Sequence, residues 1–307
     1  MQFEITILGS NGAIPAYNRH PSAQVLNFHG SLFLLDCGEG TQLQMNRYNI
    51  KRGKMDHILI SHLHGDHYFG LIGLITSFNL NYRTTPLHIY GPHGLREIIE
   101  THLHWSNTQL RYEIKFYPLS AEQSCTIYED DQLEIETIIL KHRLPTTGFL
   151  FKEKKAQLNI RKEKIQEYNI GLDDIVRIKA GEDLILPNGT VVPNTALTHS
   201  QKLPRSFAYC ADTIYNEDIL PQITGVDLLY HEATFTHEHA ARAAETMHTT
   251  AQQAGTIAAK AKVKQLMIGH FSARYEDLTV LLSEAKTVFE NSFLAIEGET
   301  FQVGLQH

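Results

Sequence analysis

The segment 58–67 constrains the fold of this chain more than any other part of the sequence. Ile58, Leu59 and Ile60 form an all-apolar run, which is typical of a strand buried on both faces. The run ends abruptly at Ser61-His62-Leu63-His64-Gly65-Asp66-His67, and apolar residues at helical spacing resume over 71–78. The polar cluster is therefore predicted to lie on a loop between a buried strand and a helix.

The residue types in this loop are those of a metal site. His62 and His64 are two residues apart at a strand exit, where an extended backbone points both side chains the same way and suits one metal ion. Gly65 permits a tight turn, and the adjacent Asp66 and His67 face differently from the first pair. They can therefore reach a second ion from the same loop.

Two metal ions need more ligands than one loop supplies, so the other ligands must come from other strand ends. Three residues meet this condition because each follows an apolar run. His142 follows 137–140, Asp212 follows 207–211 and His270 follows 266–269. We expect this repeated pattern if several strands deliver ligands to one rim of the fold.

Strands alternate with helices along most of the chain. Hairpins are predicted at 23–35 and around 112–140, and helices are predicted over 41–46, 71–78, 95–103, 250–261 and 275–289. This order predicts an α/β fold in which two mixed sheets pack together with helices outside. We expect residues 1–307 to form a single domain.

The composition changes after Phe151. Six positive charges stand against Glu153 and Glu163 over residues 152–164, and they are Lys152, Lys154, Lys155, Arg161, Lys162 and Lys164. From 151 to 194 the apolar content is too thin for an independent core. This segment is therefore predicted to be a protruding arm inserted within the domain.

Composition excludes several classes of protein. A chain of 307 residues with 42% hydrophobic and 20% charged residues is neither disordered nor a disulfide scaffold. Three widely spaced cysteines, which we expect to be inert core residues, suit a reducing cytosol and exclude a cysteine-based zinc knuckle. No stretch of about 18 apolar residues occurs, and the N-terminus lacks a basic region followed by an apolar one. These features favour a cytoplasmic protein without a membrane span.

The metal motif and its neighbours resemble a known family. His62-Leu63-His64-Gly65-Asp66-His67 with His142, Asp212 and His270 resembles the metallo-β-lactamase superfamily, whose fold is a four-layer αββα sandwich. The flanking motifs narrow the resemblance to ribonuclease Z, the endonuclease that removes 3′ trailers from precursor tRNA. They are Asp36-Cys37-Gly38-Glu39-Gly40-Thr41-Gln42, Ile89-Tyr90-Gly91-Pro92, His231-Glu232-Ala233-Thr234-Phe235, His248-Thr249-Thr250-Ala251 and Gly269-His270-Phe271-Ser272-Ala273-Arg274-Tyr275.

The resemblance implies a specific ligand allocation. His62, His64 and His142 would hold one zinc ion. Asp66, His67 and His270 would hold the other, and Asp212 would bridge the two. Imidazole and carboxylate suit Zn²⁺, although Mn²⁺ or Fe²⁺ tolerates the same set. Family members are typically homodimers in which the arm of one subunit presents substrate to the site of the other.

Phosphodiester hydrolysis needs an activated water, charge stabilisation and a proton for the departing 3′ oxygen. Two metal ions provide the first two, and Asp66 is placed to accept the proton of the water. The proton donor should titrate near neutrality without being a ligand, which favours His248. The resemblance suggests that Glu232 orients this imidazole.

An active site of this kind does not itself choose tRNA, so substrate choice must come from elsewhere. The net charge of −7 argues against a surface that grips nucleic acid everywhere, but a local basic segment could still bind it. In the family an inserted arm clasps the tRNA body, and the lysine-rich stretch 152–164 falls where such an arm would be. The family arm commonly ends in a Gly-Pro-rich tip, whereas 169–174 is acidic and lacks proline. Near the N-terminus Arg19 matches a family loop, and Tyr17 replaces its lysine.

Three other readings stay open. The first is a two-zinc phosphodiesterase that acts on other RNA or on small phosphodiesters. The second is a metal-bearing RNA-binding protein without catalysis, which the complete ligand set and His248 disfavour. The third is a β-lactam or thioester hydrolase, which would need neither the arm nor the motifs at 36–42 and 231–235.

Overall fold

The structure is a computed structural model that describes residues 2–156, 158–199 and 203–304. The chain divides into two compact units. The larger unit comprises 1–128, 135–151 and 206–307, and the smaller one comprises 129–134 and 152–205. Within the described ranges, no helix is both long and apolar enough to cross a membrane.

The first sheet of the larger unit has seven strands in the order β16-β1-β2-β3-β4-β5-β6. Its strands in chain order are β1 (Phe3–Gly9), β2 (Ala23–Phe28), β3 (Ser31–Leu35), β4 (Met55–Leu59), β5 (Leu87–Pro92), β6 (Ile114–Leu119) and β16 (Thr300–Gln302). Strands β3 to β6 are parallel, and β16, β1, β2 and β3 pair antiparallel. The predicted hairpin at 23–35 is confirmed.

The second sheet also has seven strands, in the order β15-β14-β13-β12-β9-β8-β7. They are β7 (Thr126–Glu129), β8 (Leu133–Leu140), β9 (Thr146–Glu153), β12 (Ser206–Cys210), β13 (Leu228–Glu232), β14 (Leu266–Gly269) and β15 (Ser292–Leu294). Strands β12 to β15 run parallel. Parallel neighbouring strands bring their carboxyl ends to one edge of the sheet. The predicted ligands follow such strand ends.

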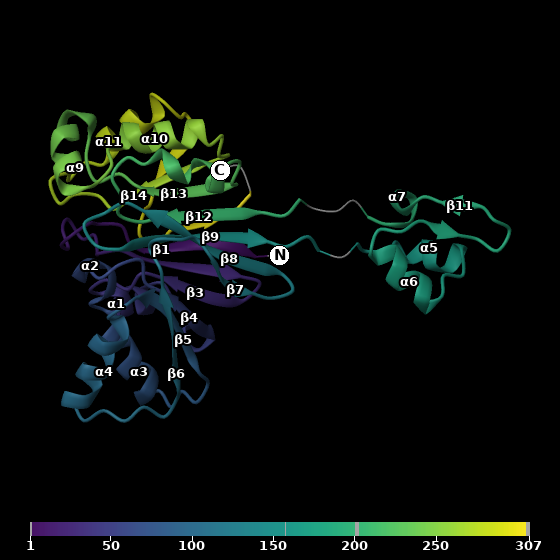
Figure 1. The fold of residues 1–307 in the computed structure, drawn as a ribbon, viewed down its shortest axis with the longest axis horizontal. Helices are drawn as coiled ribbons and strands as arrows, with labels where there is room; N and C mark the ends of the chain where they lie inside the picture. The colour runs from purple at the N-terminus through teal and green to yellow at the C-terminus, as the bar shows by residue number, and fades with distance from the viewer. Residues whose placement is uncertain (1, 157, 200–202, 305–307) are drawn as a thin grey trace. The chain divides into compact units, whose positions relative to one another are not determined.

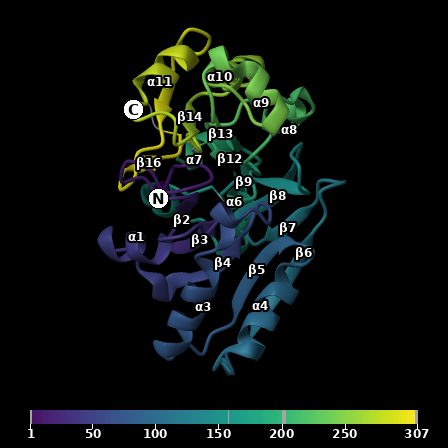
Figure 2. The same ribbon diagram turned by 90° about the vertical axis from the view of Figure 1, so that its left-hand side faces the viewer.

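Helices cover the outer face of each sheet (Figure 1, Figure 2). On the first sheet they are α1 (Thr41–Arg47), α2 (Gly65–Tyr68), α3 (Leu71–Leu80) and α4 (Leu95–Trp105), with the 3-10 turn η1 (Arg52–Lys54). On the second they are α8 (Leu220–Ile223), α9 (Ala240–Thr246), α10 (Ala251–Lys260) and α11 (Thr279–Lys286), with the 3-10 turns η2 (Glu217–Ile219) and η3 (His237–His239). The predicted four-layer αββα sandwich is confirmed.

Two apolar layers hold these elements together. Alternation along β1 sends Phe3, Ile5 and Ile7 to a fully buried face, as the period of two predicts. Between the sheets, Phe33 contacts Phe151 edge to face with centroids 5.9 Å apart. A separate cluster under α1, α3 and α4 gathers side chains such as Met45, Ile58, Leu74, Ile89 and Ile99. Burial of this kind contributes most of the folding free energy.

The smaller unit contains α5 (Lys162–Glu167), α6 (Leu172–Lys179), α7 (Asn194–Leu197) and the hairpin of β10 (Leu184–Ile185) with β11 (Val191–Val192). Among its described residues, one cluster of buried apolar side chains consists of Ile170, Ile178, Leu184, Val192 and Leu197. The sequence predicts too little apolar content here for an independent core. The segment nevertheless gathers a small cluster, because α6, α7 and the hairpin each contribute one or two buried side chains and Ile170 adds one from the connection between α5 and α6.

Candidate metal centre

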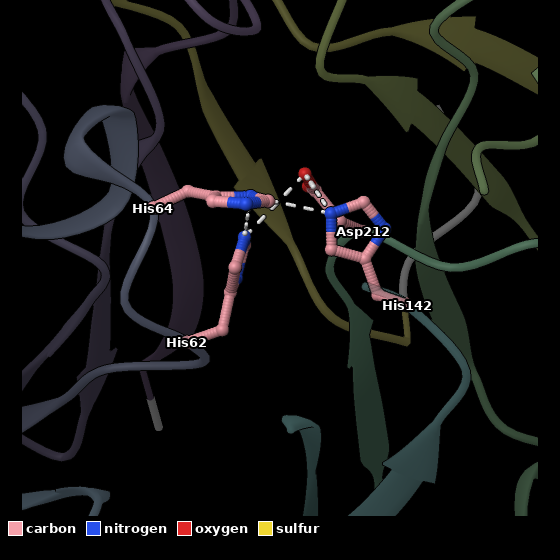
Figure 3. Close-up of side chains that lie close together, drawn as sticks. All are labelled: His62, His64, His142 and Asp212. Carbon is pink, nitrogen blue, oxygen red and sulfur yellow. Dashed lines mark hydrogen bonds and ion pairs between the residues drawn. The ribbon is translucent and has the colours of Figure 1, made fainter. Parts of the chain in front are cut away.

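The loop after β4 places two histidines against a third from a distant strand. His62 Nε2 lies 3.0 Å from His64 Nδ1, and His142, just beyond β8, has Nε2 3.2 Å from the same His64 atom. Asp212, beyond β12, has Oδ2 3.6 Å from His62 Nε2 and 3.7 Å from His142 Nε2. Figure 3 shows these four side chains facing a common point. Their ligand atoms all lie within 4.8 Å of one another.

A second group forms beside the first around the other oxygen of Asp212. Asp212 Oδ1 lies 3.3 Å from His67 Nε2 and 3.2 Å from His270 Nε2. Asp66 Oδ2 lies 3.5 Å from His67 Nε2 and 3.4 Å from His270 Nε2. Asp212 therefore turns one oxygen to each group. The structure thus brings together all seven side chains that the sequence analysis singled out as ligands.

Hydrogen bonds to the far side of four of the five histidine rings aim their Nε2 atoms inward. In four rings Nδ1 has a neighbour outside the centre: Ser61 Oγ for His62 (3.0 Å), Asp36 Oδ2 for His67 (2.8 Å), the Met247 carbonyl for His142 (2.8 Å) and Thr234 Oγ1 for His270 (2.9 Å). Their Nε2 atoms face the centre. His64 is reversed and presents Nδ1. Such outer partners fix the tautomer that a metal ligand needs.

The centre attracts positive charge. Burial alone would lower the pKa of His67, but the carboxylates of Asp212, Asp66 and Asp36 raise it well above its usual value. Within the described part of the chain, His67 Nε2 and Asp212 Oδ1 are buried without a hydrogen-bond partner. Lone pairs and carboxylate oxygens that converge in this way repel one another unless a cation lies among them. The donor set therefore fits metal ions.

His248 and Glu232 form a pair at the edge of this centre. Met247, whose backbone is left-handed (φ 57°), ends α9. Thr250 caps α10 in a capping box with Gln253. His248 therefore lies in the sharp connection between the two helices. Its Nδ1 lies 2.8 Å from Glu232 Oε1. Burial would lower the pKa of His248, but Glu232 raises it to about 9.

Asp36 has a role that the sequence analysis missed. It follows β3, is fully buried and has a left-handed backbone (φ 56°). Its carboxylate accepts from the Ser61 amide (2.7 Å), the Ser61 hydroxyl (2.9 Å), the Tyr209 hydroxyl (2.7 Å) and His67 Nδ1 (2.8 Å). The signal was present in the sequence, because Asp36 follows an apolar strand exactly as His142 and Asp212 do.

The N-terminal loop closes against the same centre. The Ala13 amide donates to Asp66 Oδ2 at 2.6 Å. A Cβ on Gly12 would lie 2.6 Å from the His270 ring, so only glycine fits there. Gly65 is also needed for space, because a Cβ there would meet the Phe69 ring at 2.1 Å. Its φ is not positive, which corrects the tight-turn argument.

Arg19 holds this loop. Its guanidinium donates to Asn11 Oδ1 (3.0 Å) and to the carbonyls of Tyr275 and Glu276. Arg19 was predicted to contact RNA, and in the structure its guanidinium also holds the loop through these bonds. Tyr17 is about half exposed, and the Arg19 guanidinium lies 5.2 Å from its ring centroid.

A pocket of about 740 Å³ opens over the centre. It is lined by several of the predicted ligands and by His248, and also by Phe69, Arg242 and Arg274. Phe69 is 65% exposed, so it offers an apolar face beside the predicted ligands. Arg274 adds positive charge to this lining, whereas Arg242 is paired with Glu245.

The cations of the smaller unit are mostly engaged by neighbouring groups. Lys152, Lys154 and Lys164 pair with Glu134, Glu129 and Glu167, and Arg161 donates to the Thr198 carbonyl. Lys155 and Lys162 are exposed, and neither has an ion pair with any residue that the structure describes. The charge available to a ligand is therefore smaller than the sequence suggested.

The cysteines only partly follow expectation. Cys37 and Cys210 are buried, and burial raises the pKa of each thiol to about 12, so both are inert. Cys125 is exposed, which corrects the expectation of three core residues. His102 and His104, which repeat the His-x-His spacing, are exposed on α4.

Comparison with known proteins finds relatives that match almost the whole chain. The Ribonuclease Z of Phocaeicola vulgatus is 48% identical over 305 residues, which cover 99% of this chain and 98% of that protein. Human tRNase Z, short form, superposes with a TM-score of 0.72 at 27% identity, covering 98% of this chain and 100% of that one.

Two further matches bear on the fold. The metallo-β-lactamase fold protein YhfI of Bacillus subtilis superposes with a TM-score of 0.67 at 20% identity and covers 98% of each chain, so it supports the fold alone. The family model described as Anti-Pycsar protein Apyc1 matches residues 3–160. That match ends before Asp212, His248 and His270, whereas the Ribonuclease Z match includes them. The chain therefore belongs to the ribonuclease Z family, and its residues 3–160 also belong to the family described as Anti-Pycsar protein Apyc1.

Proposed function

We propose that this protein is an endoribonuclease that removes the 3′ trailer from precursor tRNA by phosphodiester hydrolysis and leaves a 3′-hydroxyl on the tRNA. One observation carries the proposal: seven histidine and aspartate side chains, which follow the ends of β4, β8, β12 and β14, converge beside an open pocket. Relatives named Ribonuclease Z that match almost the whole chain support the substrate class.

The seven side chains would hold two zinc ions. One group is His62, His64 and His142, the other is Asp66, His67 and His270, and Asp212 contacts both. Mn²⁺ or Fe²⁺ accepts the same donors. Bound ions would supply Lewis acidity to the phosphoryl oxygens and would lower the pKa of a water molecule.

The remaining chemistry falls to side chains of this chain. His248 Nδ1 is committed to Glu232, so Nε2 is the nitrogen that would deliver a proton to the departing 3′ oxygen. The position of His248 on the pocket wall suits this role. Asp66 also lines the pocket, and the Ala13 amide steadies its carboxylate. We propose that Asp66 accepts the proton of the attacking water.

RNA outside the site would be held by the inserted arm, which we place at 151–194 within a single metallo-hydrolase domain. Lys155 and Lys162 are our strongest candidates for phosphate contacts there, because other cations of the arm are paired with glutamates. We also propose a cytoplasmic homodimer, in keeping with the family resemblance.

The direct test is incubation of the purified protein with a precursor tRNA that carries a 3′ trailer, followed by mapping of the new ends. The proposal expects one cut at the trailer junction and a 3′-hydroxyl on the tRNA, and a chelator should abolish the cut. Scattered cleavage, or none with zinc or manganese supplied, would contradict it.

A second substrate distinguishes the proposed function from its main alternative, a phosphodiesterase that does not use the arm. We expect a small chromogenic phosphodiester to reach the pocket without using the arm. We expect the variant Lys155→Glu/Lys162→Glu to cleave this diester at the wild-type rate and to cleave precursor tRNA at least several-fold more slowly. Wild-type activity of this variant on both substrates would favour a phosphodiesterase that does not use the arm. If the protein binds RNA without catalysis, neither substrate should be turned over.

A further inference from the structure

Thr234 lies at the point where the metal ligands meet the His248–Glu232 pair. It follows β13 by two residues and is 6% exposed. Its hydroxyl oxygen lies 2.6 Å from Glu232 Oε2 and 2.9 Å from His270 Nδ1. His248 Nδ1 is farther away, at 3.4 Å. One buried hydroxyl therefore joins a carboxylate to a ligand imidazole.

The donors and acceptors fix the direction of these two bonds. A carboxylate offers only acceptors, and a threonine hydroxyl carries a single proton. The Thr234 hydroxyl therefore donates to Glu232 Oε2. It follows that Thr234 Oγ1 accepts from the Nδ1–H of His270. This places the ring proton of His270 on Nδ1 and leaves the Nε2 lone pair facing Asp66 and Asp212.

Glu232 is the common anchor of the two imidazoles. Its side chain is fully buried. Oε1 accepts from His248 Nδ1 (2.8 Å) and from the Thr213 amide (2.9 Å), and Oε2 accepts from the amide and the hydroxyl of Thr234. With two backbone amides holding it, the carboxylate is fixed in place. It orients His248 directly, and Thr234 provides its hydrogen-bonded connection to His270.

We propose that Thr234 is a positioning residue that transmits the orientation of Glu232 to His270, so that one carboxylate sets both a metal ligand and the proton donor. This inference rests on the proposed metal-dependent hydrolysis and deepens it. Loss of the hydroxyl would leave the buried Nδ1–H of His270 without its acceptor and would loosen the ring. Outer partners of this kind are typically worth about 10- to 100-fold in metal affinity.

The test compares Thr234→Val with Thr234→Ser. Valine keeps the shape of threonine without the hydroxyl, whereas serine keeps the hydroxyl without the methyl group. Zinc affinity of the metal-free proteins is measured by competition with a chromophoric chelator, with no RNA present. We expect Thr234→Val to bind one zinc equivalent about 10- to 100-fold more weakly, and we expect Thr234→Ser to stay within a few-fold of wild type.

Thr137→Val is the matched control. Thr137 is fully buried in β8, and its hydroxyl oxygen accepts from the Cys125 amide at 3.0 Å. The same atoms are changed there without contact to a ligand, so zinc affinity should equal that of wild type. Circular dichroism of each variant identifies any that fails to fold.

The outcomes separate this relay, in which Thr234 links Glu232 to His270, from the proposed function. Wild-type zinc affinity in Thr234→Val would overturn the relay, and so would equal losses in folded Thr234→Val and Thr234→Ser. A selective loss in Thr234→Val that serine restores supports the relay even if the wild type cleaves no precursor tRNA. In that case only the proposed substrate fails.

Discussion

Asp36 is the residue whose replacement tests the outer support of the metal centre most sharply. Oδ2 accepts from Ser61 Oγ, Tyr209 and His67 Nδ1, and Oδ1 accepts from the Ser61 amide. The variant Asp36→Asn preserves the shape but retains a single acceptor oxygen. Whichever way the amide is turned, its NH₂ group faces at least one buried donor.

The magnitude follows from these contacts. A buried donor without an acceptor costs about 1–3 kcal/mol, and the remaining bonds lose their charged acceptor. We expect the free energy of unfolding of the metal-free protein to fall by about 3 kcal/mol. Because the partner that fixes the tautomer of His67 either loses its charge or becomes a donor, zinc affinity should fall by roughly 10- to 100-fold.

The assay is urea unfolding followed by circular dichroism, together with zinc competition against a chelator. Asp227→Asn is a matched control, because Asp227 is buried and accepts from the Ser206 amide (2.7 Å) but contacts no proposed ligand. It should lose stability and keep zinc affinity. If Asp36→Asn matched Asp227→Asn in zinc affinity, the inference that Asp36 orients His67 would be refuted.

Three further variants have distinct expected results. His248→Ala should keep its metal by elemental analysis and lose roughly 10²- to 10⁴-fold in cleavage rate; loss of metal would instead make His248 a ligand. Gly12→Ala should weaken zinc binding in the chelator assay, because its Cβ would lie 2.6 Å from the His270 ring; unchanged affinity would show that the loop yields. Arg19→Lys should lower the free energy of unfolding by about 2 kcal/mol in urea, with unchanged RNA affinity by filter binding; weaker RNA binding at unchanged stability would place Arg19 on the RNA.

Most of the fold could be predicted because its strands are apolar and its helices are amphipathic. Strand β14 is buried on both faces, and β1 alternates over its first residues before a fully buried end, so their patterns are clear. The short edge strands β15 and β16 were missed, because three residues carry no period. The final helix was predicted over 275–289 but begins at Thr279, where the Asp277 side chain accepts from the Thr279 amide.

The ligand set could be predicted because strand ends in such sheets meet at one edge. The supporting contacts could not, since they depend on which atoms meet after folding. Nothing local in the sequence shows that Thr234 reaches His270, or that Arg19 reaches the Tyr275 carbonyl. The sequence also does not show which cations are paired. The lysines in 152–164 look available to a ligand, whereas glutamates outside that stretch, such as Glu129 and Glu134, form ion pairs with several of them.

Anomalous X-ray diffraction at the zinc edge, on crystals of zinc-loaded protein, tests the central claim most directly. Two peaks should appear, one among His62, His64 and His142 and one among Asp66, His67 and His270, with Asp212 in contact with both. The variant Asp212→Ala should lose both peaks. A single peak, ions bound elsewhere, or an unchanged pair in the Asp212 variant would contradict the account.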